Sequence, residues 1–450
     1  MDRHLVYHFI GIGGIGMSAL ARIALRKGYR VQGSDAACNA NTRSLEKEGA
    51  KIFLGHDASQ VGEGCIIIHS SSIKKENPEW QKALALNLKI LHRSEFLQQL
   101  QQGKKSLFIT GTHGKTTTTG LLSSVLQESL LDPTFVIGGI LHPWNTNARL
   151  GAGPFFALEA DESDGSFLKG EPFGAIVTNL EREHLEYWQT DAALEAGFQQ
   201  FLQGVKNKDL LFWCQDDLGL RKLRPEGVSY GFSEGASLRA LRFEQKGFHL
   251  LFDAEFAGKR YETIAVRSIG RYNALNALAV FGLSLRLGID EGAIRRAMRE
   301  FGGTGRRMEL VGSAAGVDFF DDYAHHPTEI EVTLQALKEA VHPRRLVAVF
   351  QPHRYTRVRD LGALFPDSFS AADLLIATDI YGGGEEKIPG VDTAFLLQKI
   401  QEKRAVTYIA REELEGRLLS YLLPGDVLVT LGAGDITYLG RKICQGVSHG

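Results

Sequence analysis

The chain has 450 residues, of which 44% are hydrophobic and 23% are charged, and these values are those of an ordinary globular protein. They exclude disordered and fibrous classes. Lysine plus arginine number 51 against 53 aspartate plus glutamate, and the resulting net charge of -2 leaves no general basic surface for nucleic acid or an anionic membrane. At roughly 150 residues per domain, the length predicts about three domains.

The sequence carries no membrane or secretion signal. Its longest apolar runs, such as Cys65–Ile68, are far shorter than the ~20 residues of a membrane span. The amino-terminal stretch becomes a glycine loop within about ten residues and has no small-residue cleavage site. The 4 cysteines lie far apart without a CxxC pair, so neither a zinc site nor a disulfide framework is indicated. These features predict a protein of the reducing cytoplasm.

Short strand patterns alternate with amphipathic helix patterns from end to end, which is typical of parallel α/β architecture. In the first hundred residues the expected elements are strand Val6–Ile10, helix Ser18–Lys27, strand Arg30–Gly33, strand Cys65–His69 and a helix near Pro78–Leu86. The polar stretch Gln98–Lys105 then precedes a new strand, Ser106–Thr110, and a domain boundary is expected there.

The remaining elements continue this pattern with one exception. Turn residues between short alternating runs predict a more antiparallel region over 226–264. The elements expected after it are helices Asn273–Leu287 and Glu291–Phe301, glycines at 302, 303 and 305 as a second boundary, and strands Val317–Phe320, Arg345–Phe350, Leu374–Thr378 and Asp426–Leu431. The sequence therefore predicts three α/β domains, over 1–100, 101–305 and 306–450.

The first motif is a glycine loop, GIGGIG, between a predicted strand and a predicted helix. Its glycines are Gly11, Gly13, Gly14 and Gly16. Glycine lets the backbone approach a pyrophosphate, which then lies at the helix N-terminus, and Asp35 ends the next strand, where a ribose-binding acid belongs. Alone, this motif indicates a nicotinamide-dependent dehydrogenase. A tight turn without a ligand is the alternative.

The second motif, TGTHGKTT at Thr110–Thr117, again lies between a strand and a helix. Its backbone N–H groups, the ammonium of Lys115 and the hydroxyl of Thr116 are the groups that nucleotide phosphates and Mg²⁺ need. The loop is shorter than a standard Walker A, whose first glycine would fall at Ile109. Two nucleotide loops in successive domains argue against a simple dehydrogenase, because hydride transfer has no use for an ATP-type loop.

Two further elements could complete a metal site. The strand end LEADESD, which contains Glu159, offers hard oxygen ligands for Mg²⁺, and a solvated acidic turn is its alternative. The downstream run TNLEREH ends in His184, for which a structural or surface role is the alternative.

The C-terminal third carries the segments GRR at 305–307, DDYAHHPTE at 321–329 and QPHRYTRVR at 351–359. Three arginines within six residues follow a buried-looking strand, and such a group suits the recognition of carboxylate or phosphate. A charged surface loop is the alternative.

Together these motifs resemble the Mur ligases, which form the amide bonds of peptidoglycan precursors. The resemblance runs from HFIGIGGIGMSAL to LGAGDI at Leu431–Ile436, and it includes GRYNALNA, DDYAHHPTE and QPHRYTR. It is closest to the members that join L-alanine to UDP-N-acetylmuramate. It implies a Rossmann-like first domain for the UDP part, a central P-loop ATPase-like domain with a mostly parallel sheet for ATP, and a Rossmann-like C-terminal domain for the amino acid.

The resemblance also implies roles for individual residues. The UDP-binding residues would be Gly11, Gly13, Gly14, Gly16, Ser34, Asp35 and Ser71. The ATP-binding residues would be Gly111, Thr112, His113, Gly114, Lys115, Thr116, Thr117, Asn273, Asn276 and Arg307. The amino-acid site would hold Tyr323, His325, Arg354 and Arg357, the Mg²⁺ site Thr116, Glu159 and His184, and the catalytic residues would be Lys115, His184 and His325. Tyr272 replaces a usual histidine, and no lysine in 185–205 can be the carbamylated lysine of related ligases.

The implied chemistry activates a carboxylate, which is a poor electrophile at neutral pH. Transfer of the ATP γ-phosphoryl group gives an acyl phosphate, and a neutral amine then displaces the phosphate. A base must deprotonate the amine, and the sequence does not rank His184, His325 and His326 for this role.

Four rivals remain open. A recycling ligase of the same family attaches a whole tripeptide and shares the HHPT element, but QPHRYTR favours a single small amino acid. Folate polyglutamate ligases share the ATP loop but leave the GxGGxG domain unexplained. A regulatory nucleotide-binding protein would not need Glu159 and His184 beside Lys115. A dehydrogenase would respond to a nicotinamide cofactor. The expected partners are the small molecules UDP-N-acetylmuramate, ATP and L-alanine, with no nucleic acid and no membrane.

Overall fold

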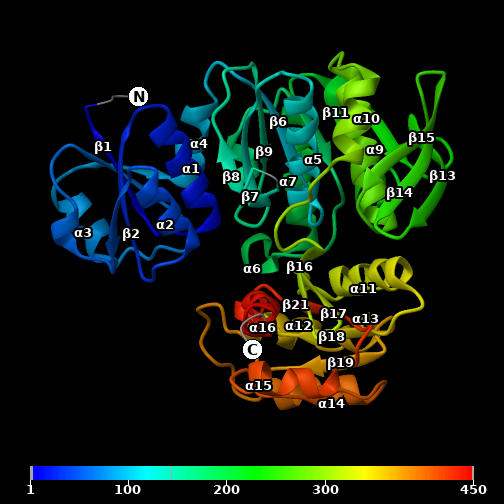
Figure 1. Cartoon of the computed structure of the whole chain (residues 1–450). Coiled ribbons are helices and arrows are strands. Elements are labelled where there is room, and N and C mark those ends of the chain that lie inside the picture. Colours follow the sequence, from blue (N-terminus) through cyan, green and yellow to red (C-terminus); the bar gives the residue numbers. More distant parts are fainter. Residues whose placement is uncertain (1–3, 143, 448–450) are drawn as a thin grey trace. The chain divides into compact units, whose positions relative to one another are not determined.

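The structure is a computed structural model that describes residues 4–142 and 144–447 (Figure 1). The chain divides into two compact units. The first unit holds the chain up to Arg242 together with Phe252–Val266 and Leu275–Gly302. The second unit holds Phe243–Leu251, Arg267–Ala274 and the chain from Gly303 onward. Three separate sheets confirm the predicted three-part α/β fold.

The N-terminal sheet has the order β3-β2-β1-β4-β5, and all of its neighbouring strands are parallel. Its strands are β1 Val6–Ile10, β2 Arg30–Asp35, β3 Lys51–Leu54, β4 Cys65–His69 and β5 Lys89–His92, and its helices are α1 Ile15–Arg26, α2 Ala40–Lys47, α3 Pro78–Ala85 and α4 Arg93–Gln101. The strand order reverses at β1, and in such sheets ligands bind beyond the carboxyl ends of the strands at that point.

One local prediction needs correction in this domain, and one helix was not predicted. The first helix begins at Ile15 rather than Ser18, because the end of the glycine loop already enters the helix. The polar stretch Gln98–Lys105 is partly helical, since α4 continues to Gln101. Phe96 and Leu100 are buried on one face of α4, and this apolar stripe extends the helix despite the glutamines on its other faces.

The central sheet has the order β15-β14-β13-β12-β11-β10-β6-β9-β7-β8. Its strands are β6 Lys105–Thr110, β7 Thr134–Leu141, β8 Thr146–Arg149, β9 Phe155–Glu159, β10 Gly174–Val177, β11 Leu211–Cys214, β12 Val228–Gly231, β13 Leu238–Lys246, β14 His249–Phe256 and β15 Lys259–Arg267. Its helices are α5 Lys115–Glu128, α6 Leu185–Trp188, α7 Asp191–Gly204, α8 Leu218–Leu223, α9 Arg271–Arg286 and α10 Glu291–Arg299.

Most of this sheet is parallel, from β9 through β6, β10 and β11 to β12 and β13. Strands β13, β14 and β15 are neighbours joined by two-residue turns, and such short connections permit only antiparallel pairing. The antiparallel character predicted for 226–264 is therefore present, but it begins at β13, because β12 is parallel to both of its neighbours.

The C-terminal sheet has the order β16-β17-β21-β18-β19-β20, and only its edge pair β16–β17 is antiparallel. Its strands are β16 Glu309–Ala314, β17 Val317–Asp322, β18 Leu346–Phe350, β19 Leu374–Ala377, β20 Thr407–Tyr408 and β21 Val427–Leu431, and its helices are α11 Pro327–Val341, α12 Tyr355–Leu361, α13 Phe365–Ser368, α14 Thr393–Gln401, α15 Leu414–Arg417 and α16 Leu439–Val447.

Residues of β18 alternate between two apolar clusters. Leu346, Ala348 and Phe350 belong to one cluster, while Val347 and Val349 belong to the other. The sheet is therefore covered on both faces, as parallel sheets require, and the ends of its strands are where polar side chains can gather.

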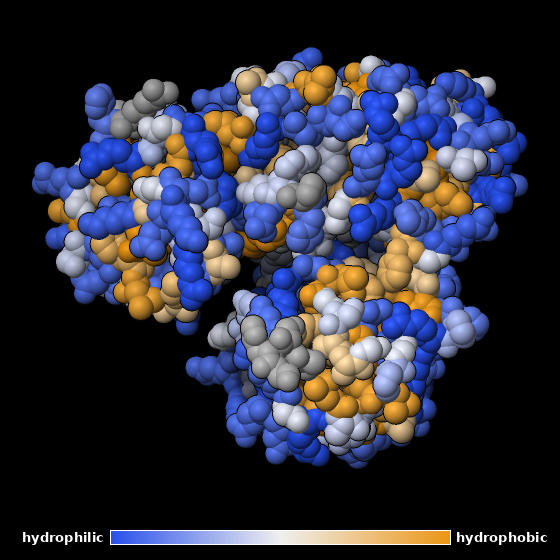
Figure 2. All heavy atoms as spheres, viewed as in Figure 1, coloured by the Kyte–Doolittle hydropathy of each residue, from blue (hydrophilic) through white to orange (hydrophobic). Residues whose placement is uncertain are grey.

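Hydrophilic residues cover much of the face seen in Figure 2, and apolar residues form separate groups on it. Among the described residues, no helix combines the length and the apolar composition needed to cross a membrane.

Candidate active site

The first glycine loop joins β1 to α1 at the carboxyl end of the N-terminal sheet. Gly11 has a left-handed φ of 77°, and the N–H groups of Gly11 and Ile12 both donate to the Ser34 carbonyl, at 2.8 and 2.9 Å. Gly13 donates its N–H to the Asp35 carboxylate at 2.8 Å, and a Cβ on Gly13 would come within 2.6 Å of a neighbouring side chain. Strand β2 thus holds the loop backbone at the start of α1, where a diphosphate would bind.

The other predicted UDP residues lie at this same edge of the sheet. Gly14 is the N-cap of α1, and Gly16 lies in its first turn. The buried Ser34 hydroxyl donates to the Glu79 carboxylate at 2.6 Å, so this side chain supports the loop from inside the domain. Ser71, just beyond β4, donates its hydroxyl to the Asp164 carboxylate at 2.8 Å. Contact of these residues with UDP stays a prediction.

The second loop joins β6 to α5 and packs against the end of β10. Gly111 and Gly114 have left-handed φ values of 129° and 83°. A Cβ on Gly111 would lie only 2.2 Å from the Thr178 hydroxyl oxygen, so this position tolerates no side chain. That hydroxyl donates to the His113 carbonyl at 2.6 Å, and the His113 N–H donates to the Asn179 side chain at 2.8 Å. The residues that follow β10 therefore hold this side of the loop in place.

Lys115, the first residue of α5, is placed by the loop and by a carboxylate. Its ammonium donates to the Gly111 and Thr112 carbonyls at 2.6 and 3.1 Å, and to both oxygens of Glu162 at 3.0 and 2.8 Å. Burial would lower the pKa of Lys115, but the carboxylates of Glu162 and Asp161 outweigh it and raise this pKa above its usual value. The ammonium is therefore protonated and held at the mouth of the loop.

The threonine hydroxyls of the loop form hydrogen bonds with different neighbouring residues. The Thr112 hydroxyl accepts the Glu181 N–H at 2.9 Å, and Thr117 lies in the first turn of α5. The Thr116 hydroxyl donates to Glu159 at 3.2 Å, and the other carboxylate oxygen of Glu159 accepts the Gly138 N–H at 2.6 Å. Thr116 and Glu159 thus offer two adjacent hard oxygens, a donor set that fits Mg²⁺.

His184 reaches this cluster through Glu162. It has a left-handed φ of 59°, and its Nε2 lies 3.7 Å from Glu162 and 3.8 Å from Glu183. A non-glycine residue in this conformation is uncommon and is frequently found at functional positions. The structure therefore places His184 near Glu162, the carboxylate that pairs with Lys115. The role of His184 as a metal ligand stays a prediction.

The two asparagines of α9 have different surroundings. The Asn276 side chain lies against Gly114, since a Cβ there would come within 2.9 Å of its amide nitrogen. The Asn273 amide donates to the Ile269 carbonyl at 2.8 Å, one turn back along the chain. Tyr272, which replaces the expected histidine, is partly buried against an apolar cluster of the second unit, and desolvation raises its pKa. The structure thus gives Tyr272 a packing role.

The predicted amino-acid residues come together in the second unit. The Tyr323 and His325 rings lie 5.1 Å apart, and the guanidinium of Arg307 lies 5.1 Å from the Tyr323 ring. Arg357 contacts the His353 Nδ1 at 3.3 Å, and the His353 ring lies 5.5 Å from that of His325. One small region of this unit therefore gathers two histidines and several cations.

Arg354 is the N-cap of α12 and has a positive φ of 67°, and its N–H donates to the Tyr381 carbonyl at 2.9 Å. This backbone conformation directs the start of α12 from β18, so that Arg354 and Arg357 share its first turn. Burial, together with the neighbouring cations, lowers the pKa of His353 to about 3. His353 is therefore neutral at physiological pH and resists protonation there, so its ring can take part in hydrogen bonds only as a neutral imidazole.

The structure separates the candidate bases. The His326 side chain accepts the Thr328 N–H at 3.3 Å and caps α11, with Glu329 completing a capping box. His325 directs Nδ1 to the Tyr323 carbonyl at 2.9 Å. A capping histidine has its ring committed to the helix end, so His326 is the weakest of these candidates.

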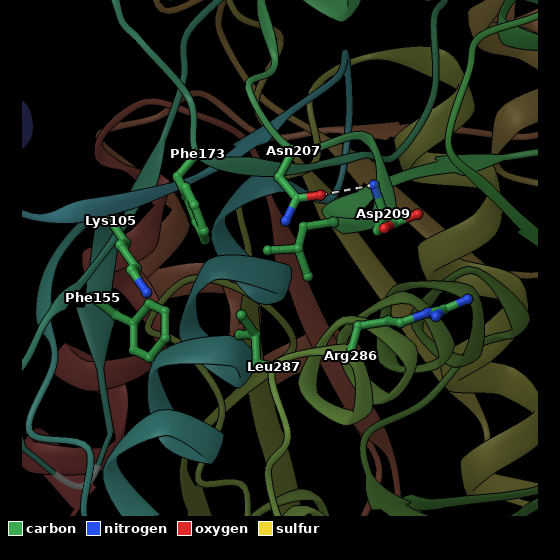
Figure 3. A pocket seen from close by; sticks show the side chains of 8 residues that line it. Lys105, Phe155, Phe173, Asn207, Asp209, Arg286 and Leu287 are labelled. Carbon is green, nitrogen blue, oxygen red and sulfur yellow. Dashed lines mark hydrogen bonds between the residues drawn. The ribbon is translucent and has the colours of Figure 1, made fainter.

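A separate hollow of about 340 Å³ lies at the opposite, amino-terminal ends of the central strands (Figure 3). Lys105 and Phe155 line it from the starts of β6 and β9, together with Phe173, Asn207, Asp209, Leu210, Arg286 and Leu287. None of the predicted site residues lines this hollow, so it is distinct from the nucleotide loops.

Comparison with known sequences and structures agrees with this geometry. Three family models match in succession: the "Mur ligase family, catalytic domain" over 6–105, the "Mur ligase middle domain" over 109–284 and the "Mur ligase, glutamate ligase domain" over 306–434. A UDP-N-acetylmuramate–L-alanine ligase of Protochlamydia amoebophila is 45% identical, over 99% of this chain and 98% of its own.

The chain belongs to the Mur ligase family. A second relative, the UDP-N-acetylmuramate–L-alanine ligase of Caulobacter vibrioides, is 42% identical, over 96% of this chain and 94% of its own. The solved UDP-N-acetylmuramate–alanine ligase of Thermotoga maritima superposes with a TM-score of 0.86 at 29% identity, covering 99% of this chain and 100% of that one. A murein peptide ligase of Psychrobacter arcticus, at 22% identity and a TM-score of 0.73 over 98% of each chain, shares the fold. The resemblance that the motifs indicated is confirmed.

Sequence reasoning missed several residues of this Mur ligase site. Glu162, the partner of Lys115, stood within the quoted run EADESD but was not separated from the other acids. His353 stood within QPHRYTR and Glu329 within HHPTE, and neither was assigned a role. Arg93 lies outside every motif, although it contacts Asp161 and Asp164 of the middle domain. Only the fold brings these residues to the site.

Proposed function

We propose that this Mur ligase joins L-alanine to the lactyl carboxylate of UDP-N-acetylmuramate and releases ADP and phosphate. The observation that carries the proposal is the match to alanine-adding relatives, at 45% identity over 99% of the chain. Relatives with the same printed activity recur at 40% to 43% identity, over at least 96% of this chain. The tripeptide-adding alternative has weaker support, since the solved tripeptide-adding ligase of Neisseria meningitidis is 27% identical over only 66% of this chain, with a TM-score of 0.60.

ATP would bind at the loop of residues 111–117. Glycines with left-handed φ values expose the backbone N–H groups of this loop, and the protonated Lys115 supplies the cation that a transferred phosphoryl group needs. The role of this loop is positioning and charge neutralisation, and these provide most of the catalysis of phosphoryl transfer.

Thr116 and Glu159 would hold a Mg²⁺ ion, because they present adjacent oxygen donors beside Lys115. When bound, this ion would neutralise charge on the nucleotide phosphates. Glu162 and His184 border the same cluster, so they would set its charge and orient its members.

The alanine carboxylate would bind to Arg354 and Arg357 in the second unit. Guanidinium groups bind a carboxylate in a planar, two-pronged geometry, which orients the rest of the amino acid. His325 is the group there that would take a proton from the alanine ammonium, whereas His353, whose ring is its neighbour, is too weak a base at a pKa of about 3 and would act only through hydrogen bonds. A cytoplasmic location is part of the proposal, because the reaction consumes ATP and all four cysteines carry free thiols.

A phosphate-release assay tests the proposal directly. The full chain would be incubated with ATP, Mg²⁺ and UDP-N-acetylmuramate, and with alanine, serine, glycine or the tripeptide in separate reactions. We expect release with alanine, weaker release with serine and glycine, and none with the tripeptide. A methyl group supplies only about 1–3 kcal/mol of discrimination, so the small amino acids are weakened rather than excluded.

Two outcomes would contradict the proposal. Release with the tripeptide but not with alanine would assign the chain to the recycling activity. Absence of release under every condition, from a chain that binds ATP, would indicate a regulatory nucleotide-binding protein. Lys115→Ala is the control for background hydrolysis, since it removes the cation of the ATP loop.

A further inference from the structure

Arg93 connects the two nucleotide-binding domains of the first unit. It is the first residue of α4, just beyond the carboxyl end of β5. Its Nη2 donates to Asp161 at 3.1 Å and to Asp164 at 3.0 Å. Both aspartates belong to the loop that follows β9 of the middle domain. Burial opposes ionisation of Asp164, but hydrogen bonds from Ser166 and the charge of Arg93 hold the pKa of this carboxyl well below its usual range.

The other edge of the Arg93 guanidinium faces the first glycine loop. Its Nη1 lies 3.3 Å from the position that a Cβ on Gly16 would occupy. Gly16 is in the first turn of α1, whose N–H groups have no acceptors within the helix. This first turn contains no acidic residue. A helix N-terminus and a guanidinium therefore lie side by side, and both favour an anion.

The contact between these two domains is held by further hydrogen bonds. Asn147 of β8 donates to the Ile15 carbonyl at 2.7 Å and to the Ser18 hydroxyl at 2.9 Å, so it binds the first turn of α1 directly. The Arg22 guanidinium donates to the Asn147 side-chain oxygen and, at 2.8 Å, to Glu48. The first turn of α1 is thus attached to the middle domain, next to the loop that Arg93 contacts.

We infer that Arg93 binds the diphosphate of the uridine nucleotide through its Nη1 edge while its Nη2 edge holds the Asp161–Asp164 loop. The inference rests on the proposed function, which supplies the nucleotide. A guanidinium has five N–H donors in a fixed plane, and it can serve two anionic partners at once, which a lysine ammonium does less well. Arg93 is therefore a binding residue for the uridine nucleotide, and it lies outside the sequence motifs of the chain.

The same contact links the two nucleotide sites. Asp161 and Asp164 flank Glu162, which holds Lys115 at the ATP loop. A diphosphate bound at the Nη1 edge would add negative charge beside the same guanidinium that neutralises this loop. Arg93 is thus placed so that binding of the uridine nucleotide to the first domain would change the charge around Lys115.

Ligand titrations on the full chain test the inference. Calorimetry would measure UDP affinity, and competition against UDP at millimolar concentration would measure uridine affinity, for the parent, Arg93→Ala and Arg93→Lys. A charge-assisted contact of this kind corresponds to roughly a ten- to hundredfold loss of affinity. We expect Arg93→Ala to lose UDP affinity by about this factor while uridine affinity stays within about twofold. Arg93→Lys should fall between, because it keeps the charge without the planar fork.

Arg26→Ala is the matched control. Arg26 lies in the last turn of α1, at the end opposite to the glycine loop, pairs with Glu48 at 3.4 Å and has a side chain that is 65% exposed. It should bind UDP like the parent. Equal losses for UDP and uridine in Arg93→Ala would overturn the inference, because they would indicate a loosened domain contact instead of a lost phosphate contact.

Unchanged UDP affinity in both Arg93 variants would overturn it as well, and would leave Arg93 as an ion pair only. A parent chain that does not bind UDP would refute the proposed function itself, so the two failures are distinguishable. Arg93→Lys keeps the ion pairs with the middle domain, and it therefore decides the question even if Arg93→Ala does not fold.

Discussion

The ion pair between Lys115 and Glu162 allows a stability effect to be separated from a catalytic one. The Glu162 side chain is 1% exposed, and that of Lys115 is 16% exposed. Removing one partner of a buried pair typically costs ~3–5 kcal/mol, because the other charge stays buried without compensation. The partial exposure of Lys115 places Lys115→Met at the lower end, about 3 kcal/mol.

This cost corresponds to a measurable change in melting temperature. A unit of roughly 300 residues unfolds with an entropy of about 0.6 kcal/mol/K, so a loss of about 3 kcal/mol lowers its melting temperature by roughly 5 °C. The double variant Lys115→Met/Glu162→Gln removes both charges, and we expect it to recover at least half of this loss. Phosphate release should be absent in both variants, since the loop cation is missing in both.

Calorimetric scans at pH 7 would measure the melting temperatures. Lys105→Met is the matched control, because the exposed Lys105 ammonium lies over the Phe173 ring at 5.2 Å and forms no buried ion pair. A double variant that melts no higher than Lys115→Met would refute the reasoning. The buried Glu162 carboxylate without its partner would then not be the cause of the lost stability. A single variant that melts with the parent would refute it too.

Three further predictions concern the metal, the amino acid and the pH dependence of stability. Glu159→Gln should raise the Mg²⁺ concentration needed for half-maximal phosphate release, because an amide oxygen binds a hard cation less well than a carboxylate. Glu171→Gln, at an exposed position, is the control, and an equal shift in both variants would contradict the proposal that Glu159 is a Mg²⁺ ligand. Arg357→Lys should raise the alanine KM by roughly tenfold with little change in the ATP KM, measured by steady-state phosphate release, and the reverse pattern would make the arginine a phosphate contact. Burial raises the pKa of Asp322 to about 6, so the folded state binds a proton at this carboxyl more tightly than the unfolded state does. The protonated carboxyl therefore contributes stability that is fully present below about pH 4 and is lost as the pH rises through 6. Asp322→Asn should therefore gain stability relative to the parent between pH 4 and pH 7, by up to ~3 kcal/mol in urea unfolding, and a difference independent of pH would contradict this.

Local sequence patterns predicted the strands whose ends are set by turn residues next to them in the chain. Strand Val6–Ile10 and strand Cys65–His69 have the predicted bounds, because each is a short apolar run ended by turn residues. The start of α1 was misplaced because a helix can begin inside a glycine loop when tertiary contacts hold it. Tyr272 shows a similar limit, since the apolar cluster that it packs against includes Leu334 and Leu337, which lie more than fifty residues away in sequence.

The site was predictable where a motif carries its own chemistry. The loop around Lys115 and the neighbouring Thr116 and Glu159 were proposed in this way; the structure places Thr116 and Glu159 side by side, and their roles stay predictions. Glu162 and Arg93 were not found, because nothing in their local sequence distinguishes them from solvated charges. Their contacts join residues 47 and 71 positions apart, and only the folded sheet brings them together.

The charges around the ATP loop also bear on which form of the nucleotide the enzyme accepts. Glu159, Asp161, Glu162 and Asp164 place four carboxylates beside the cations of Lys115 and Arg93, so these six side chains carry an excess of two negative charges. A bare nucleotide triphosphate approaching this surface is repelled, whereas a nucleotide that arrives with a divalent cation brings the missing positive charge with it. We therefore expect this loop to disfavour metal-free nucleotide, so that free ATP in excess over Mg²⁺ is a poor competitor of the complex.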